Sequence, residues 1–118
     1  MMTGSGNDLP VDLEAAKKRV MGDMDFLKEM LVMFEESIPT FLEGIRDAIE
    51  QRDARTLSQT AHQFKGAALN LSVLKVAENA ADLDELGKKD DFEKAGAVYK
   101  DLELSVSDFR EFMIKEPW

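Results

Sequence analysis

Cysteine is absent from this 118-residue sequence, and histidine occurs once, at position 62. Without cysteine the chain can form neither a disulfide nor a thiolate metal site, and this lack is compatible with a reducing compartment. A single histidine cannot supply the two Glu-x-x-His pairs of a di-iron centre in a helical bundle. Because neither a Gly-x-Gly-x-x-Gly run nor a P-loop occurs, we expect no ATP binding or hydrolysis and no cofactor of the chain's own.

Basic residues are scarce as well. The 15 lysines and arginines face 24 aspartates and glutamates, which gives a formal net charge of −9. Nucleic-acid surfaces and anionic membranes both attract clustered positive charge, so we expect neither as a partner. No apolar run approaches the length of a membrane span, and the first residues lack the basic and apolar regions of a signal peptide. The expected location is therefore the cytoplasm.

The length fits one domain with one hydrophobic core. Residues 1–8 are polar and contain Gly4-Ser5-Gly6, so we expect a disordered tail there. The remaining residues, 9–116, are predicted to form a single helical domain. We expect this domain to be a monomer.

Apolar residues recur at helical spacing in the first half of that domain. A short helix is predicted to contain Leu9 and to end near Gly22. A long helix follows, with its start at Asp23 or Asp25. Its apolar stripe keeps its phase across Pro39, which predicts one kinked helix instead of two separate ones.

The second half contains three more amphipathic segments, and no segment alternates long enough to be a strand. The expected boundaries are a cap at Asp53 and an end near Leu71, a cap at Ser72 and a stop at Gly87, and a last helix from Phe92 to before Pro117. Residues 88–91 form a short charged linker. The predicted fold is all-α, an antiparallel up-down four-helix bundle with a short additional N-terminal helix. Its core is expected to include Met24, Met30, Met33, Phe26, Phe34, Phe41, Phe64, Phe92 and Phe109.

His62 lies in the third of these helices but off its apolar face. Leu57, Ala61, Phe64 and Ala68 are spaced so that they share one side of the helix. On the same helical wheel His62 points about 140° away from that side. The imidazole is therefore expected to face water or a partner.

An exposed imidazole can act as a nucleophile toward phosphorus. At neutral pH a surface imidazole is mostly uncharged, so a ring nitrogen offers a lone pair. Lys65, three residues on, is placed to meet phosphoryl oxygens. Gly66, four residues on, costs about 1 kcal/mol of helix stability relative to alanine, which suggests a steric requirement for close approach of a second protein.

This stretch resembles a known family. Ala61-His62-x-x-Lys65-Gly66-Ala67-Ala68-x-Asn70-Leu71 is similar to the phosphorylated-histidine motif of histidine phosphotransfer (HPt) domains. The likeness includes Phe34-Glu35-Glu36-Ser37-Ile38-Pro39, which looks like the family's acidic stretch ending in proline, and Leu83-Asp84, where the family usually has Leu-Glu. It covers roughly residues 13–102. One departure is Ser72, where the family usually has glycine, so the turn after the His62 helix is expected to differ.

The resemblance implies that His62 accepts a phosphoryl group from the aspartate of a receiver domain and passes it to another receiver. Lys65 would be the phosphate partner and Gly66 the site of clearance, with Nε2 as our choice of reacting nitrogen. The partners would be response-regulator receiver domains and a hybrid sensor histidine kinase, and Mg²⁺ would belong to the receiver alone. The chain would be a phosphoryl carrier, not an enzyme.

Further residues have open roles. Gln59 and Ser58 are expected near the phosphoryl group or its water, Arg55 opposite an acidic receiver rim, and Leu69 in an apolar docking patch or on an ordinary surface. Asp84 either orients the imidazole or is a solvated charge.

The function has alternatives too. The competing hypothesis is a helical adaptor that binds a receiver or kinase without being phosphorylated. A third possibility is a domain taken from a larger hybrid sensor kinase.

Overall fold

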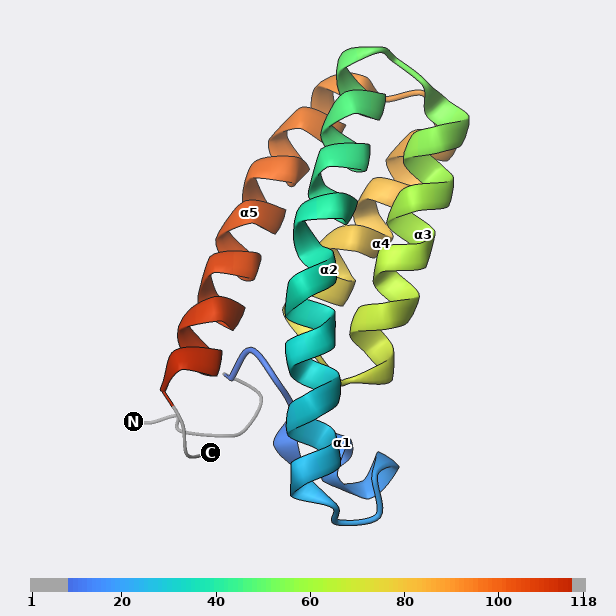
Figure 1. Cartoon of the computed structure of the whole chain (residues 1–118). Helices are drawn as coiled ribbons and strands as arrows, with labels where there is room; N and C mark the ends of the chain where they lie inside the picture. The colour runs from blue at the N-terminus through green and yellow to red at the C-terminus, as the bar shows by residue number, and fades with distance from the viewer. Residues whose placement is uncertain (1–8, 116–118) are drawn as a thin grey trace, which may run out of the picture.

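The computed structural model describes residues 9–115. In chain order the helices are α1 (Leu13–Arg19), α2 (Met24–Glu50), α3 (Ala54–Asn70), α4 (Leu74–Lys88) and α5 (Phe92–Ile114) (Figure 1). Over this range there is no strand, so the prediction of an all-α helical bundle is confirmed. The tail expected over residues 1–8, and residue 116 at the expected domain boundary, lie outside the described residues.

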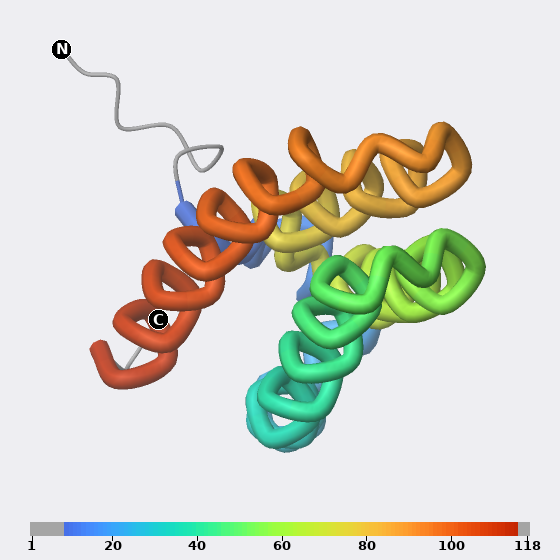
Figure 2. The backbone as a smooth tube through the Cα atoms, turned by 90° about the horizontal axis from the view of Figure 1, so that it is seen from above, coloured from blue at the N-terminus to red at the C-terminus, as the bar shows by residue number. Residues whose placement is uncertain are grey.

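Four long helices run side by side, and α1 lies across one end of them. Figure 1 shows the chain passing along α2, back along α3, forward along α4 and back along α5. Helices α2 and α4 each contact both α3 and α5. Consequently α3 and α5 lie at diagonal corners of the bundle, as the view along it shows (Figure 2).

The four connections between helices share one backbone conformation. A residue with positive φ follows each helix: Met21, Arg52, Ser72 and Asp90, at φ of 55°, 53°, 58° and 55°. In each turn the next amide donates to a carbonyl five residues back, as Val73 does to Ala68 at 2.9 Å. This is the Schellman motif, which ends a helix within two residues. The connections are therefore short enough to pack consecutive helices against each other.

Aspartates begin most of the helices. The side chains of Asp12, Asp23, Asp53 and Asp91 each accept a hydrogen bond from an amide in the first turn. The caps expected at Asp23 and Asp53 are confirmed. The hydrogen bond to the Thr56 hydroxyl, followed by that to the Thr56 amide, lowers the pKa of Asp53 below its ordinary value.

The caps expected around α4 are wrong at both ends. Val73 is the N-cap residue and makes no side-chain cap bond, while Ser72 occupies the left-handed position of the preceding turn. The Ser72 carbonyl accepts a hydrogen bond from the Asp12 amide at 2.9 Å, which ties the start of α1 to this turn. Gly87 does not stop α4, which continues to Lys88, and Asp90 supplies the left-handed residue instead.

A cluster of phenylalanines fills the centre of the bundle. The Phe64 ring stacks on Phe41 and Phe34, with centroids 4.7 and 5.8 Å away, and Phe34 meets Phe109 edge to face at 5.5 Å. These aromatic contacts connect α2, α3 and α5 and fix the inner face of α3. Helix α2 is unbroken across Pro39, as expected.

Two apolar residues lie outside the core, contrary to expectation. Phe26 is 48% exposed and Met33 62% exposed, because both lie off the side of α2 that buries Leu27, Leu31 and Phe34. Leu9 is 46% exposed and precedes α1, which begins four residues later. The helix expected to contain Leu9 thus begins later, and Val11, before α1, is fully buried.

Candidate functional site

His62 lies in the middle of α3, on the side away from the core. Its side chain is 66% exposed, as the helical wheel predicts. The opposite side of α3 is buried through Leu57, Ala61, Phe64 and Ala68. The imidazole is therefore attached to a helix that packing holds firmly, yet its ring is open to solvent.

The carboxylate of Asp84, on α4, lies beside the ring. Its Oδ2 is 3.3 Å from Nδ1 of His62, and the whole residue is only 4% exposed. An ionised carboxylate can only accept, so the Nδ1 of a neutral imidazole must carry the proton in this contact. The lone pair of the neutral ring is then on Nε2, which points away from Asp84.

One further donor and one cation lie beside Asp84. The Ser58 hydroxyl donates to Oδ1 at 2.5 Å, and Lys88 places Nζ 3.8 Å from Oδ2 and 3.7 Å from Glu85. Burial acts to raise the pKa of Asp84, but the hydrogen bonds of Ser58 and His62 and the charge of Lys88 together outweigh it. The net result is a pKa below the ordinary aspartate value. Asp84 is therefore a charged hydrogen-bond acceptor at neutral pH.

These groups line one surface depression of about 400 Å³. Its residues are Ser58, Gln59, His62, Gln63, Asp84 and Lys88. Four of the residues singled out in the sequence are thus brought together from two helices. Of the other four, Lys65, Gly66, Leu69 and Arg55, none lines this depression.

Those four residues share α3 with His62 but lie elsewhere on it. Lys65 is half-buried and has no ion pair with any residue of the described range. Gly66 is exposed, and a Cβ built there would meet nothing within 4 Å. Close packing inside the chain is therefore not the reason for glycine at this position. Leu69 is 43% exposed and Arg55 is exposed.

Two lining residues, Gln63 and Lys88, were not revealed by the sequence, and Lys88 is the one that contacts Asp84. It was expected in a charged linker, whereas it ends α4 and turns its ammonium group toward Asp84. The available signal is its spacing: residues i and i+4 of a helix are neighbours, so Asp84 and Lys88 can pair once α4 is extended to residue 88.

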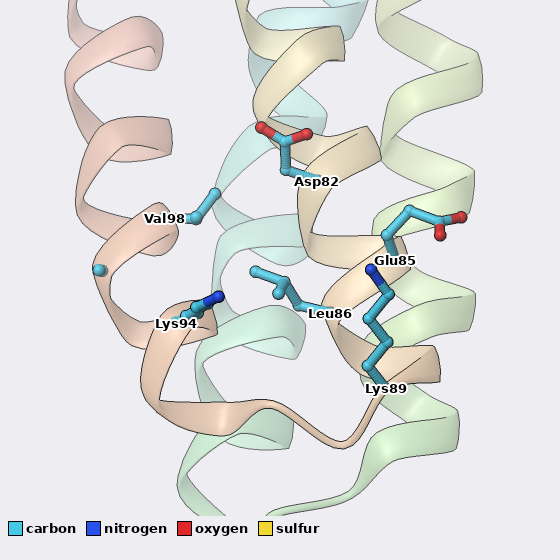
Figure 3. A pocket seen from close by; sticks show the side chains of 7 residues that line it. Asp82, Glu85, Leu86, Lys89, Lys94 and Val98 are labelled. Carbon is cyan, nitrogen blue, oxygen red and sulfur yellow. The ribbon is translucent and has the colours of Figure 1, made fainter.

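A second groove lies on the other side of α4, between α4 and α5. It is lined by Asp82, Glu85, Leu86, Lys89, Lys94, Ala97 and Val98. Figure 3 shows Leu86 and Val98 between the two helices, with charged side chains around them. None of these residues lines the His62 depression.

Residues 9–115 contain neither a helix suited to span a membrane nor a cluster of side chains suited to a metal ion. No helix there combines the length and apolarity needed to cross a membrane. Nor do three or more histidine, aspartate or glutamate side chains in this range gather in a way that could hold a metal ion.

Comparison with known proteins points to one family. The family model described as "Hpt domain" matches residues 29–112. The sensor protein EvgS of Escherichia coli strain K12 is 30% identical over 81 residues, which is 69% of this chain but only 7% of EvgS. EvgS of Escherichia coli O157:H7 matches with the same identity and coverage. The chain thus spans a small part of these curated relatives.

A solved structure supports the fold. The histidine-containing phosphotransfer protein B (HptB) from Pseudomonas aeruginosa PAO1 superposes with a TM-score of 0.81, covering 89% of this chain and 91% of HptB at 22% identity. Taken with the family model, which spans most of the chain, the conclusion is direct. The chain belongs to the Hpt domain family, the histidine phosphotransfer modules of two-component phosphorelays.

Proposed function

We propose that His62 is the residue of this chain that carries the phosphoryl group, and that Nε2 is the reacting atom. The contact between Nδ1 and the Asp84 carboxylate is the observation that carries this proposal. It fixes the proton on the inner nitrogen and leaves the nucleophilic lone pair on the outer one. The 66% exposure of the side chain lets a second protein reach that lone pair.

The transfer is a single displacement at phosphorus. The Nε2 lone pair attacks the phosphorus of an aspartyl phosphate on a receiver domain, and the bond from phosphorus to the aspartate oxygen breaks. The aspartate leaves as a carboxylate, and the phosphorylated ring keeps its Nδ1 proton. Positive charge that develops on the ring is met by Asp84. The reverse of this step, with a different receiver, passes the group on.

Neighbouring residues supply positive charge for the phosphoryl group and space for the approaching receiver. Lys88 borders the depression and Lys65 lies one helical turn from His62, so both can meet phosphoryl oxygens as ammonium groups. Gly66 leaves open space beside the imidazole, where a receiver's backbone could approach. Mg²⁺ would be supplied by the receiver's own acidic pocket, and this chain would hold no cofactor.

The broader setting follows from this role. Members of the Hpt family are phosphocarriers, and we propose that this chain likewise has no kinase or ATPase activity of its own. Its partners would be receiver domains and a hybrid sensor histidine kinase, in keeping with the similarity to a sensor protein. We further propose a monomer in the cytoplasm. Whether the domain works alone or inside a longer kinase does not change the chemistry at His62.

The test is transfer from a phosphorylated receiver domain to the chain and to its His62→Gln variant. Intact mass, measured under alkaline conditions that preserve phosphohistidine, should show one acid-labile phosphoryl group on the unmodified chain and none on the variant. The variant should fold and bind the receiver nearly as before, since His62 contributes little to the core. Lys100→Gln, exposed on α5 and outside the depression, serves as the matched control and should still be phosphorylated.

Two results would contradict the proposal. A phosphoryl group on the His62→Gln variant would place the reaction elsewhere. Binding to several receivers with no transfer to the unmodified chain would favour the adaptor hypothesis.

A further inference from the structure

We propose that Gly87 and Ser58 are positioning residues, which hold the Asp84 carboxylate at Nδ1 of His62 and so select the tautomer that can react. The catalytic consequence rests on the proposed function of His62, but the tautomer itself does not. The first observation is the contact between α3 and α4 at Gly87.

Gly87 is where the two helix backbones come closest. A Cβ at this position would lie 2.9 Å from the Ser58 amide nitrogen, 3.1 Å from the Ala54 carbonyl oxygen and 3.2 Å from the Ser58 Cα. All three are backbone atoms, so no flexible side chain can move aside. Any residue larger than glycine must therefore separate α3 from α4 or rotate one against the other.

The other helical glycines of the described residues lack this constraint. A Cβ at Gly66 or Gly96 would meet nothing within 4 Å, and one at Gly44 would meet only the Thr60 side chain, at 3.3 Å. Gly87 costs helix stability as they do, since glycine is about 1 kcal/mol worse than alanine inside a helix. Gly87 differs from the other glycines in its close contact with the backbone of α3, at the position of Ser58.

Asp84 lies one turn before Gly87 on the same buried side of α4. It reaches back across the contact to α3, where Ser58 and His62 each bond one of its two oxygens. The Ser58 bond is short, at 2.5 Å, whereas the His62 contact of 3.3 Å is already slightly beyond the usual N–H···O range of about 2.7–3.2 Å. If the two helices moved apart by a few tenths of an ångström, the contact between Asp84 and His62 would therefore be the first to break.

Ser58 anchors the carboxylate against this loss. With Oδ1 held by the hydroxyl, the rotation of the Asp84 side chain is fixed and Oδ2 is directed at the imidazole. Without that bond the carboxylate can turn toward Lys88, which is 3.8 Å away. Ser58 therefore acts on His62 through Asp84, not by contact with the phosphoryl group.

The experiment combines a spectroscopic and a kinetic readout on Gly87→Ala, Ser58→Ala and the control Gly96→Ala. Imidazole ¹⁵N chemical shifts of the unphosphorylated protein give the fraction of molecules in which the His62 ring is protonated at Nδ1. The unmodified chain and Gly96→Ala should hold the proton mainly at Nδ1. Gly87→Ala and Ser58→Ala should both shift it toward Nε2 and slow phosphorylation by a receiver about 10-fold, the lower end of what loss of an orienting partner usually costs.

The outcomes separate this inference from the proposed function. If Gly87→Ala does not fold, Ser58→Ala decides, because removal of one hydroxyl introduces no clash. An unchanged tautomer in a folded Gly87→Ala or in Ser58→Ala would overturn the inference even if His62 is phosphorylated. A shifted tautomer would support it even if no receiver phosphorylates the chain, in which case only the proposed function fails.

Discussion

Asp84 is a charged side chain in the contact between two helices, and its 4% exposure would be costly without partners. Its partners are two hydrogen-bond donors, Ser58 and His62, and the ammonium group of Lys88. The same arrangement stabilises the carboxylate and orients the imidazole. One residue thus connects the stability of the bundle to the chemistry of its surface, and this connection has a pH dependence.

We expect Asp84→Asn to lower the free energy of unfolding by about 1–3 kcal/mol at pH 7, because hydrogen bonds to an ionised acceptor are lost. The native pKa of Asp84 is lowered, so its stabilising effect is complete above the ordinary value of 3.8 and disappears as the pH falls through the native pKa. Urea unfolding at pH 7 and near pH 3 should therefore show the difference between variant and unmodified chain shrinking in acid.

The control for this prediction is Asp82→Asn, two residues away on the exposed side of α4. It should change the unfolding free energy little at either pH. A difference for Asp84→Asn that is equal at both pH values would show that its carboxylate is not stabilised as a charge.

A second prediction at this scale concerns two glycines in open surroundings. Gly66→Ala and Gly96→Ala should each raise the unfolding free energy by about 0.5–1 kcal/mol, since neither new methyl group meets an atom within 4 Å. Only Gly66→Ala should slow phosphoryl transfer from a receiver, because only its methyl group enters the space beside His62. Equal transfer rates for both variants would remove the clearance role of Gly66.

The helix boundaries are set by N-cap residues and by residues with positive φ. Three of the turns place an aspartate or valine N-cap directly after a residue with positive φ, so one helix ends and the next begins within three residues. Of the five described residues with positive φ, only Gly22 is glycine, while Met21, Arg52, Ser72 and Asp90 carry side chains. A side chain in that conformation costs about 1–2 kcal/mol, which the packing of the helices must outweigh.

Ser72→Gly should therefore stabilise the protein, by about 0.5 kcal/mol after the greater entropy of glycine in the unfolded chain is deducted. Thermal unfolding of the variant should show a higher Tm. Ser107→Gly, inside α5 and exposed, is the matched change without a positive φ and should lower the Tm. An equal fall in both variants would mean that the turn at Ser72 carries no strain.

The sequence predicts the elements better than their contacts. Asp53 and the apolar stripe across Pro39 are local signals. The first correctly predicts the start of α3, and the second correctly predicts that α2 continues through the proline. The prediction that Gly87 ends α4 is wrong because glycine is required there by the close backbone of α3. A contact with another helix leaves no signal in the local sequence pattern. At the site, the wheel placed His62 outward, but it could not decide whether Asp84 met it, since that depends on how α3 and α4 align. Lys88 was missed for the same reason.

On the scale of the whole molecule, the proposed reacting surface lies along α3 and its border with α4, while α5 is diagonal to α3. Leu69 and Leu104, on α3 and α5, are both exposed apolar residues, at 43% and 66%. Only Leu69 shares the outward side of α3 with His62, two helical turns away. The two leucines are therefore suited to a comparison of the two surfaces.

Leu69→Lys should weaken receiver binding about 10-fold, or about 1.4 kcal/mol, if this surface docks the receiver. Leu104→Lys changes the net charge of the acidic protein by the same amount, so it controls for long-range attraction and should leave affinity nearly unchanged. Titration calorimetry with one receiver would measure both, and circular dichroism would verify folding. Equal affinities for the two variants would exclude Leu69 from the docking surface.

The diagonal placement of α5 also has a practical use. Because the chain has no cysteine, a Leu104→Cys variant would carry a single thiol, at an exposed position of α5. A protein tethered to a sensor surface through that sulfur would be held by α5, the helix diagonal to the one that carries His62. Each immobilised molecule would then present the same accessible imidazole to a flowing receiver.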